Sequence, residues 1–209
     1  MQLTKSVKAL FFALAGVLLH AGCSGPSAPP KTGSPSAASP YPNWEPDAKL
    51  LDELAPASDV AEYQVRPPKG YDFNPLPPGA PAGLKGGAWA GALRNNQTAP
   101  QFMIGIATSP DGAGKMTAQL YLDKMLGGIK QQRTNWTQTT LERGQINGLT
   151  FFRIYWTGTE LHKRWKMHGF MYAAQDGPQF IHLSSQDVEP THEEALKVAE
   201  TAALTFKKK

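Results

Sequence analysis

Proline placement divides the chain into two unequal parts. Fourteen of its 18 prolines lie between Ser24 and Gly83, whereas four of its five tryptophans lie from Leu84 onward. Proline fixes φ and removes a backbone donor, so the first part cannot form long helices or central strands. Of the 209 residues, the 126 from position 84 onward suffice for one hydrophobic core. We therefore predict a single domain at 84–209.

The first 22 residues have the pattern of an export signal. Lys5 and Lys8 precede an apolar run that ends at Leu19 and is too short to span a membrane as a mature helix. The next string, LLHAGCSG, resembles the lipobox of bacterial lipoproteins, in which cleavage before the cysteine leaves a thiol that is acylated. We expect residues 1–22 to be a lipoprotein signal peptide and Cys23 to carry the lipid anchor.

Cys23 is the only cysteine of the chain. A disulfide framework is excluded, and so is any zinc site that needs two thiolates. Lipidation is the use we expect for this thiol, which places the protein on a membrane of the bacterial envelope. His20 stands where lipoboxes usually carry an apolar residue, so cleavage after Cys23 is the alternative, and it would give a soluble secreted or periplasmic protein.

Two segments separate the signal from the predicted domain. Residues 23–43 are rich in Ser, Ala and Pro and show no hydrophobic periodicity, which predicts a flexible, disordered tether. Residues 44–83 contain a short helical pattern at 47–54 and a short strand pattern at 63–66. We expect this second segment to be a proline-rich extended stretch that lies over the domain; the alternatives are that it continues the tether, or that it supplies a strand and a lid that belong to the domain.

The pattern from Leu84 onward predicts an α+β fold. Apolar residues at helical spacing indicate helices at about 117–132 and 191–206, the second begun by a capping box of Thr191 and Glu194. Alternation and turn signals predict strands at 88–93, 101–108, 136–142, 149–160, 162–175 and 179–186. This order implies an antiparallel β-sheet packed by two main helices.

The same stretch resembles the PsbP-like α/β sandwich. The features that carry the resemblance are Tyr121, Leu122 and Leu126 in the first helix, Gly148 and Arg153 in a strand, and Phe206 after the last helix. This superfamily includes the extrinsic photosystem II subunit and DcrB-like bacterial lipoproteins. The resemblance implies a binding or assembly role, and it assigns no catalytic residue.

A basic surface is the candidate binding face. If the hairpin turns around Gly158 and Thr159, Tyr155 lies opposite Arg164 and one side of the sheet gathers positive charge. The residues of this candidate face are Arg153, Tyr155, Arg164, Lys166 and His168. Such a face suits an acidic protein partner or an anion. The alternative is a solvated face neutralised by nearby carboxylates.

Other site chemistry is not predicted. The chain has no G-x-S-x-G elbow, P-loop or dinucleotide fingerprint, so we expect no cofactor and no catalytic residue. His162 and His168 are too far apart on one strand to share a metal. His182 could approach His168 from the neighbouring strand, but no carboxylate stands at a recognisable ligand spacing, and the stretch THEEA around His192 lacks the second histidine of H-E-x-x-H. Removal of residues 1–22 lowers the net charge from +4 to +2, which disfavours nucleic acid as a partner.

The sequence thus predicts an exported, lipid-anchored, non-enzymatic envelope protein that binds a protein partner or takes part in assembly. A lipoprotein that binds a small ligand or an anion on its basic and aromatic sheet face is the alternative. The oligomeric state stays open.

Overall fold

An eight-stranded antiparallel sheet forms the centre of the molecule. The computed structural model describes residues 43–77, 80, 83–94, 98–108 and 116–209, so the predicted signal peptide, Cys23 and most of the tether lie outside the described residues. The strands follow the order β3-β4-β5-β10-β9-β8-β6, and β7 also pairs with β8. Their bounds are β3 (Asp72–Pro75), β4 (Leu84–Ala90), β5 (Gln101–Thr108), β6 (Arg133–Gln138), β7 (Glu142–Ile146), β8 (Leu149–Glu160), β9 (Lys166–Asp176) and β10 (Gln179–Val188).

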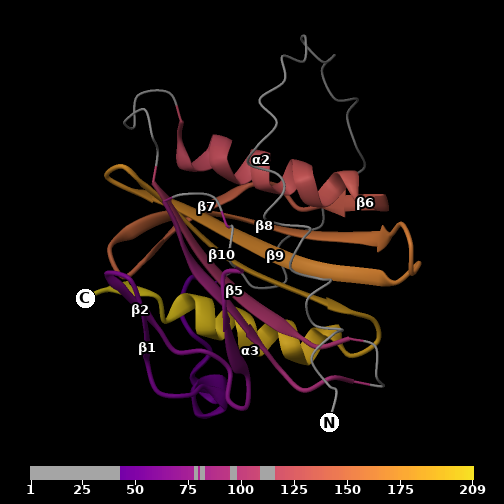
Figure 1. Cartoon of the computed structure of the whole chain (residues 1–209), viewed down its shortest axis with the longest axis horizontal. Helices are drawn as coiled ribbons and strands as arrows, with labels where there is room; N and C mark the ends of the chain where they lie inside the picture. The colour runs from indigo at the N-terminus through magenta and orange to yellow at the C-terminus, as the bar shows by residue number, and fades with distance from the viewer. Residues whose placement is uncertain (1–42, 78–79, 81–82, 95–97, 109–115) are drawn as a thin grey trace.

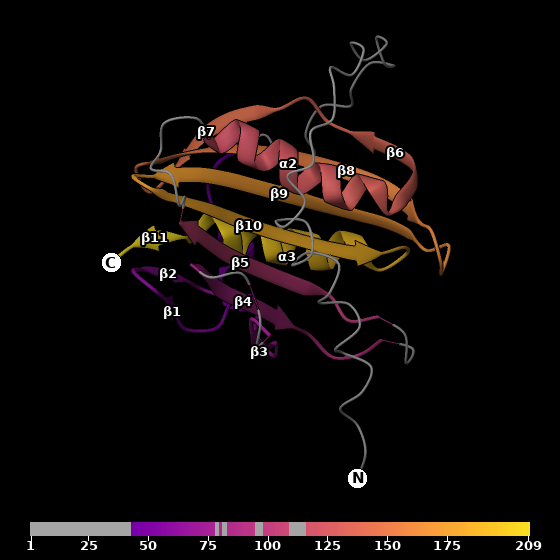
Figure 2. The same ribbon diagram turned by 45° about the horizontal axis from the view of Figure 1, so that its top comes forward.

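Two helices cover opposite faces of this sheet (Figures 1 and 2). Helix α2 (Ala118–Gln131) packs on one face through a cluster that includes Leu122, Ile154 and Met171. Helix α3 (His192–Leu204) packs on the other face through a cluster that includes Ala199 and Phe170. The predicted antiparallel α+β architecture is confirmed. No helix within the described ranges has the length and apolarity needed to cross a membrane.

Helix α2 follows its sequence pattern closely. Tyr121, Leu122, Met125 and Leu126 are buried, as the i, i+3, i+4 spacing predicts for one apolar stripe. Thr117 caps the helix, because its Oγ1 accepts a hydrogen bond from the Leu120 amide (3.2 Å). The expected range of 117–132 is therefore confirmed to within one residue at each end.

The predicted capping box of α3 is wrong. Thr191 is the N-cap residue, but its side chain accepts no hydrogen bond from the helix amides. Its Oγ1 instead accepts a hydrogen bond from Arg94 Nη1 (2.8 Å). A long-range contact thus replaces the local cap that the sequence suggested.

Segment 44–83 is built into the fold. It contributes a 3-10 helix, η2 (Ala48–Glu53), and three strands, while Leu54 and Tyr63 belong to the main hydrophobic cluster. Strand β3 joins the main sheet beside β4. The other two, β1 (Ser58–Val60) and β2 (Tyr63–Val65), form a small sheet with the C-terminal β11 (Lys207–Lys208). Core side chains therefore occur 30 residues before Leu84, and of the alternatives for this segment the structure has the one in which it belongs to the domain.

The β8–β9 hairpin turns later than predicted. Strand β8 runs through Gly158 and Thr159 to Glu160, and Thr159 pairs with Lys166 across the hairpin. Tyr155 therefore lies opposite Phe170 and not opposite Arg164, which lies in the turn with a φ of 59°. This register separates Arg164 from Tyr155 and so divides the predicted basic face.

Candidate functional site

The five residues of the predicted basic face do not form one surface. Arg153 is 0% exposed and Tyr155 is 9% exposed, because helix α3 and the N-terminal segment cover this side of the sheet. Arg164 lies exposed in the β8–β9 turn, whereas Lys166 and His168 lie at the start of β9. The structure instead divides the polar residues into two groups, one inside the molecule and one at the end of the sheet.

The buried cluster consists of Arg153, Tyr155, Tyr172 and Glu200, with Glu142 at its edge. Arg153 Nε donates to Glu142 Oε2 at 2.7 Å, and Arg153 Nη1 lies 3.5 Å from Glu200 Oε1. The hydroxyls of Tyr155 and Tyr172 both donate to the same Glu200 oxygen. A positive charge with two carboxylates and two phenols is the kind of compensation that burial of an arginine requires.

The first described residues of the chain close the buried cluster from outside. The carbonyl oxygen of Asn43 accepts a hydrogen bond from Arg153 Nη1 (3.2 Å), and the Trp44 ring centroid lies 4.4 Å from Arg153 Cζ. Trp44 also makes an edge-to-face contact with Tyr172, with ring centroids 5.5 Å apart. A Cβ added to Gly144 would lie 2.1 Å from the Trp44 ring, so this glycine makes room for it. Arg153 thus fastens the N-terminal segment to the sheet through hydrogen-bond and cation–π contacts.

Burial controls protonation in the buried cluster. Desolvation raises the pKa of Glu200 to about 7, against the opposing effects of the two phenols and Arg153. Desolvation also raises the pKa of Tyr155 and of Tyr172, and the adjacent Glu200 raises both further. The phenols therefore keep their protons and act as hydrogen-bond donors. These groups form hydrogen bonds and ion pairs with one another, which is the arrangement expected of a structural network.

The sheet-end cluster consists of His168, Glu189 and His192, with Lys166 beside it. His168 comes from β9, Glu189 follows β10, and His192 is the first residue of α3. His168 Nε2 lies 2.7 Å from Glu189 Oε1, and the two imidazole rings are stacked with centroids 3.8 Å apart. Lys166 Nζ also lies 2.7 Å from Glu189 Oε1. Three separate elements therefore bring two imidazoles and a carboxylate together.

The surroundings of the sheet-end cluster favour a charged carboxylate and a neutral imidazole. Hydrogen bonds from Lys166, and then from His168, lower the pKa of Glu189. Burial, and then the charge of His168, lower the pKa of His192. Asp187 is buried nearby, where one oxygen is paired with Arg94. Within the described residues, the buried Nδ1 of His192 has no hydrogen-bond partner.

Sequence reasoning missed Glu189 and His192. Their spacing, Glu-x-x-His, follows a strand that pairs with the strand of His168, and this was the signal available in the sequence. The other histidines lie elsewhere. His162 is exposed in the β8–β9 turn, and His182 is buried under α2, where its Nδ1 lies 2.9 Å from the Tyr121 hydroxyl. Burial lowers the pKa of His182 to about 4, so this side chain stays neutral.

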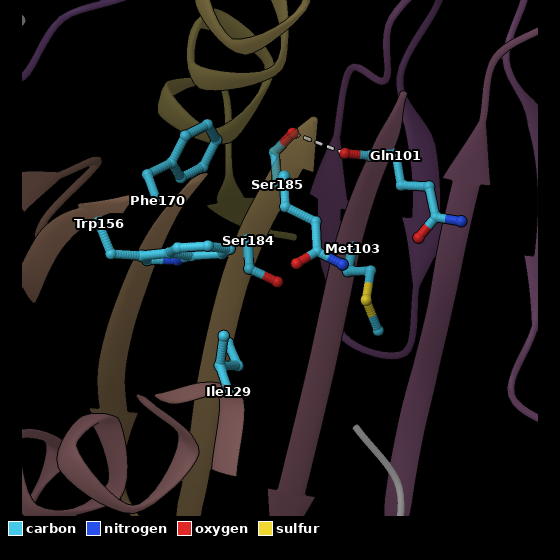
Figure 3. A pocket seen from close by; sticks show the side chains of 8 residues that line it. Gln101, Met103, Ile129, Trp156, Phe170, Ser184 and Ser185 are labelled. Carbon is cyan, nitrogen blue, oxygen red and sulfur yellow. Dashed lines mark hydrogen bonds between the residues drawn. The ribbon is translucent and has the colours of Figure 1, made fainter. Parts of the chain in front are cut away.

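A small hollow lies beside the C-terminal half of α2 (Figure 3). It has room for about one water molecule. Ser184 and Ser185 line it together with Gln101, Met103, Ile129, Trp156, Phe170 and Gln186. Ser185 Oγ donates to the Gln101 carbonyl oxygen at 2.6 Å, so its hydroxyl is engaged in the fold. This hollow is too small for a substrate.

Comparison with known proteins places the fold. Neither a protein-family model nor a curated protein sequence matches the chain. The solution structure of cyanobacterial PsbP (CyanoP) from Synechocystis sp. PCC 6803 is similar with a TM-score of 0.55 at 12% identity, covering 76% of this chain and 94% of that one. LpqN of Mycobacterium tuberculosis, described as involved in cell envelope biogenesis, gives a TM-score of 0.46 at 12% identity over 72% of this chain and 82% of its own. The chain therefore has a PsbP-like fold, as its sequence pattern predicted.

Proposed function

We propose that this protein is an exported, lipid-anchored and non-enzymatic domain that binds a protein partner in the bacterial envelope. The observation that carries the proposal is the fastening of Asn43 and Trp44 to the buried Arg153. The fastening lies 20 residues after Cys23, the predicted lipid anchor. A chain held by lipid at Cys23 and by Arg153 at Asn43 and Trp44 would be a tether with two defined attachment points.

The length of the tether sets how the domain is presented. A fully extended chain spans about 3.5 Å per residue, so 20 residues of any conformation reach about 70 Å at most. Acyl chains on Cys23 would hold the near end in the membrane, and Trp44 would hold the far end on the domain. The domain would then search for partners within one tether length of the membrane surface.

The edge of the sheet at β3 is the surface best suited to a protein partner. Strand β3 pairs only with β4 among the described strands, and its other edge is open. Phe73 on this strand is 48% exposed, although its ring also contacts Trp89 with centroids 4.9 Å apart. Leu93, just after β4, is 49% exposed. Exposed aromatic and aliphatic side chains beside an open strand edge are features of protein interfaces.

Support for a non-enzymatic role comes from the buried cluster. Burial raises the pKa of Glu200 to about 7, yet its hydrogen bonds go to Tyr155 and Tyr172 inside the core. A catalytic carboxyl needs access to a substrate. The anion-binding alternative loses Arg153, which faces Glu142 and Glu200, and keeps only the separate exposed cations Arg164 and Lys166.

Anchoring and partner binding are tested in the same cells. The membrane fraction is expected to contain the wild-type protein, with acyl groups on Cys23 by mass spectrometry, and Cys23→Ala is expected to release it. Cross-linking followed by affinity recovery should then yield a partner with the wild type and much less of it with Phe73→Ser. Leu161→Ser is the matched control, because Leu161 is 41% exposed in a distant turn. An unmodified Cys23, or equal recovery with Phe73→Ser, would contradict the corresponding half of the proposal.

A further inference from the structure

The sheet-end cluster has the ligand set of a transition-metal site. One nitrogen of each imidazole and one oxygen of Glu189 all lie within 4.8 Å of one another. Donor atoms around a shared zinc ion lie about 3 Å apart, given bond lengths of about 2.0–2.2 Å. Rotation of half-exposed side chains therefore suffices to close the cluster around an ion. We infer that His168, Glu189 and His192 bind a divalent transition-metal ion such as Zn²⁺.

The chemistry of the three residues selects this class of ion. Two imidazoles and one carboxylate suit Zn²⁺ and its neighbours in the first transition row, whereas Ca²⁺ and Mg²⁺ prefer oxygen ligands only. The pair of stacked rings, 3.8 Å between centroids, would be costly with both rings protonated. A metal ion binds the neutral form of each ring, and one ring must turn out of the stack so that both in-plane nitrogen lone pairs point at the same ion.

The surroundings favour a cation at the same point. His192 Nδ1 is buried, and it has no hydrogen-bond partner in the described part of the chain. Asp187 is buried beside His192, and although its Oδ2 pairs with Arg94, its Oδ1 likewise lacks a partner among the described residues. Burial removes both atoms, His192 Nδ1 and Asp187 Oδ1, from water without giving them a hydrogen-bond partner in the described chain. A bound cation would supply the missing interaction.

Lys166 is the competitor for this site. Its Nζ lies 2.7 Å from the same Glu189 oxygen, and 59% of its side chain is exposed. An exposed ion pair of this kind contributes little, so the lysine can leave when a divalent ion arrives. Three protein ligands then leave a coordination position for water or for a group of a bound partner.

Metal binding is measured on the full-length protein, purified from membranes in detergent without a polyhistidine tag and stripped with EDTA. Isothermal titration calorimetry with Zn²⁺ is expected to show one ion per chain. The variants His168→Gln, Glu189→Gln and His192→Gln should each weaken binding by more than about tenfold, which loss of even an outer-shell partner can cause. Visible d–d bands of Co²⁺ used in place of Zn²⁺ should change in the same variants.

The matched control is His162→Gln, since His162 lies exposed in the β8–β9 turn outside the cluster. This variant should bind Zn²⁺ as the wild type does. Absence of Zn²⁺ binding, equal affinity in the three cluster variants, or loss of binding in His162→Gln would each overturn the inference. Circular dichroism verifies that each variant is folded, and should one cluster variant not fold, the remaining two decide.

Substitution of Lys166 supplies a further test, because the expected result is tighter binding, which a misfolded variant would not show. Lys166→Met frees Glu189 and should tighten Zn²⁺ binding by about two- to fivefold, in keeping with the small contribution of an exposed ion pair. A variant that binds Zn²⁺ no more tightly than the wild type would remove Glu189 from the ligand set, and with it the site as inferred.

Discussion

The two polar clusters of this fold each pair glutamate with a basic side chain, but in opposite surroundings. In the buried cluster, Arg153 and Glu200 are removed from solvent and bond to each other and to two phenols. In the sheet-end cluster, His168 and Glu189 remain partly exposed, and a nitrogen of the adjacent His192 has no partner in the described chain. The comparison teaches that a perturbed protonation state is not by itself a sign of function. A polar atom near the surface that lacks a hydrogen-bond partner is the better indication of a binding site.

The largest expected change in stability follows from substitution of Arg153, at the centre of the buried cluster. Arg153→Met should lower the free energy of unfolding by about 3–5 kcal/mol, because it leaves the Glu200 carboxylate buried without its cation. Urea denaturation followed by tryptophan fluorescence measures the change. Arg164→Met, the same substitution in the exposed turn, should stay within about 0.5 kcal/mol of the wild type. Similar losses in both variants would show that Arg153 does not organise the interior.

The next effect concerns the pH dependence of stability. The folded-state pKa of Glu200 is about 7, above its ordinary value of 4.5, so the folded protein holds more protons than the unfolded chain between these two values. Its contribution to stability is therefore fully present below pH 4.5 and is lost as the pH rises through 7. The slope in this window is at most about 1.4 kcal/mol per pH unit.

Glu200→Gln should remove this slope, because an amide does not titrate. The quantity to measure is the difference in unfolding free energy between wild type and variant at several pH values, which cancels the carboxylates they share. A difference that is constant between pH 4.5 and 7 would show that Glu200 titrates normally.

A smaller effect is expected where the N-terminal segment is fastened. Gly144→Ala places a Cβ against the Trp44 ring and should cost about 1–3 kcal/mol, the range for overpacking. Protease cleavage near Trp44 should become faster as well. Gly127→Ala in α2 is the control, since its Cβ meets open space and should stabilise the helix by about 0.5–1 kcal/mol. Unchanged cleavage in Gly144→Ala would argue against the fastening.

The smallest effect is expected at the sheet-end cluster without metal. His168→Gln should change the unfolding free energy by less than about 1 kcal/mol, because its pairing with Glu189 is partly exposed. The contrast should emerge in thermal melts with Zn²⁺, which should raise the Tm of the wild type and leave that of His168→Gln unchanged. A large loss of stability without metal would make His168 a structural residue like Arg153.

The sequence was sufficient where a local pattern determines structure. The apolar spacing around Leu122 and Met125 predicted α2, and alternation along β8 correctly placed Arg153 and Tyr155 on the same side of the sheet. It could not reveal that this side is covered, because Glu200 resembles an exposed helix residue until the partner strands are known. Coverage of a sheet face is a tertiary property, and a mixed pattern is compatible with either surface.

The remaining errors have the same origin in long-range contacts. Segment 44–83 was read as a cover because prolines argue against regular structure, yet Tyr63 packs on Phe206 from the other end of the domain. The spacing of Glu189 and His192 does not predict a site unless the β9–β10 register, which brings His168 beside them, is known. Pairings between distant segments are the information that a single sequence supplies least.

The small sheet has a consequence for the order of events in the life of the chain. Gln64 of β2 pairs with Lys207 of β11, so two segments near opposite ends of the described chain depend on each other. Such pairings form late, because a long loop must close first. The small sheet can therefore be completed only after β11 has been synthesised, so β2 is among the first strands to be made and among the last to find its full set of neighbours.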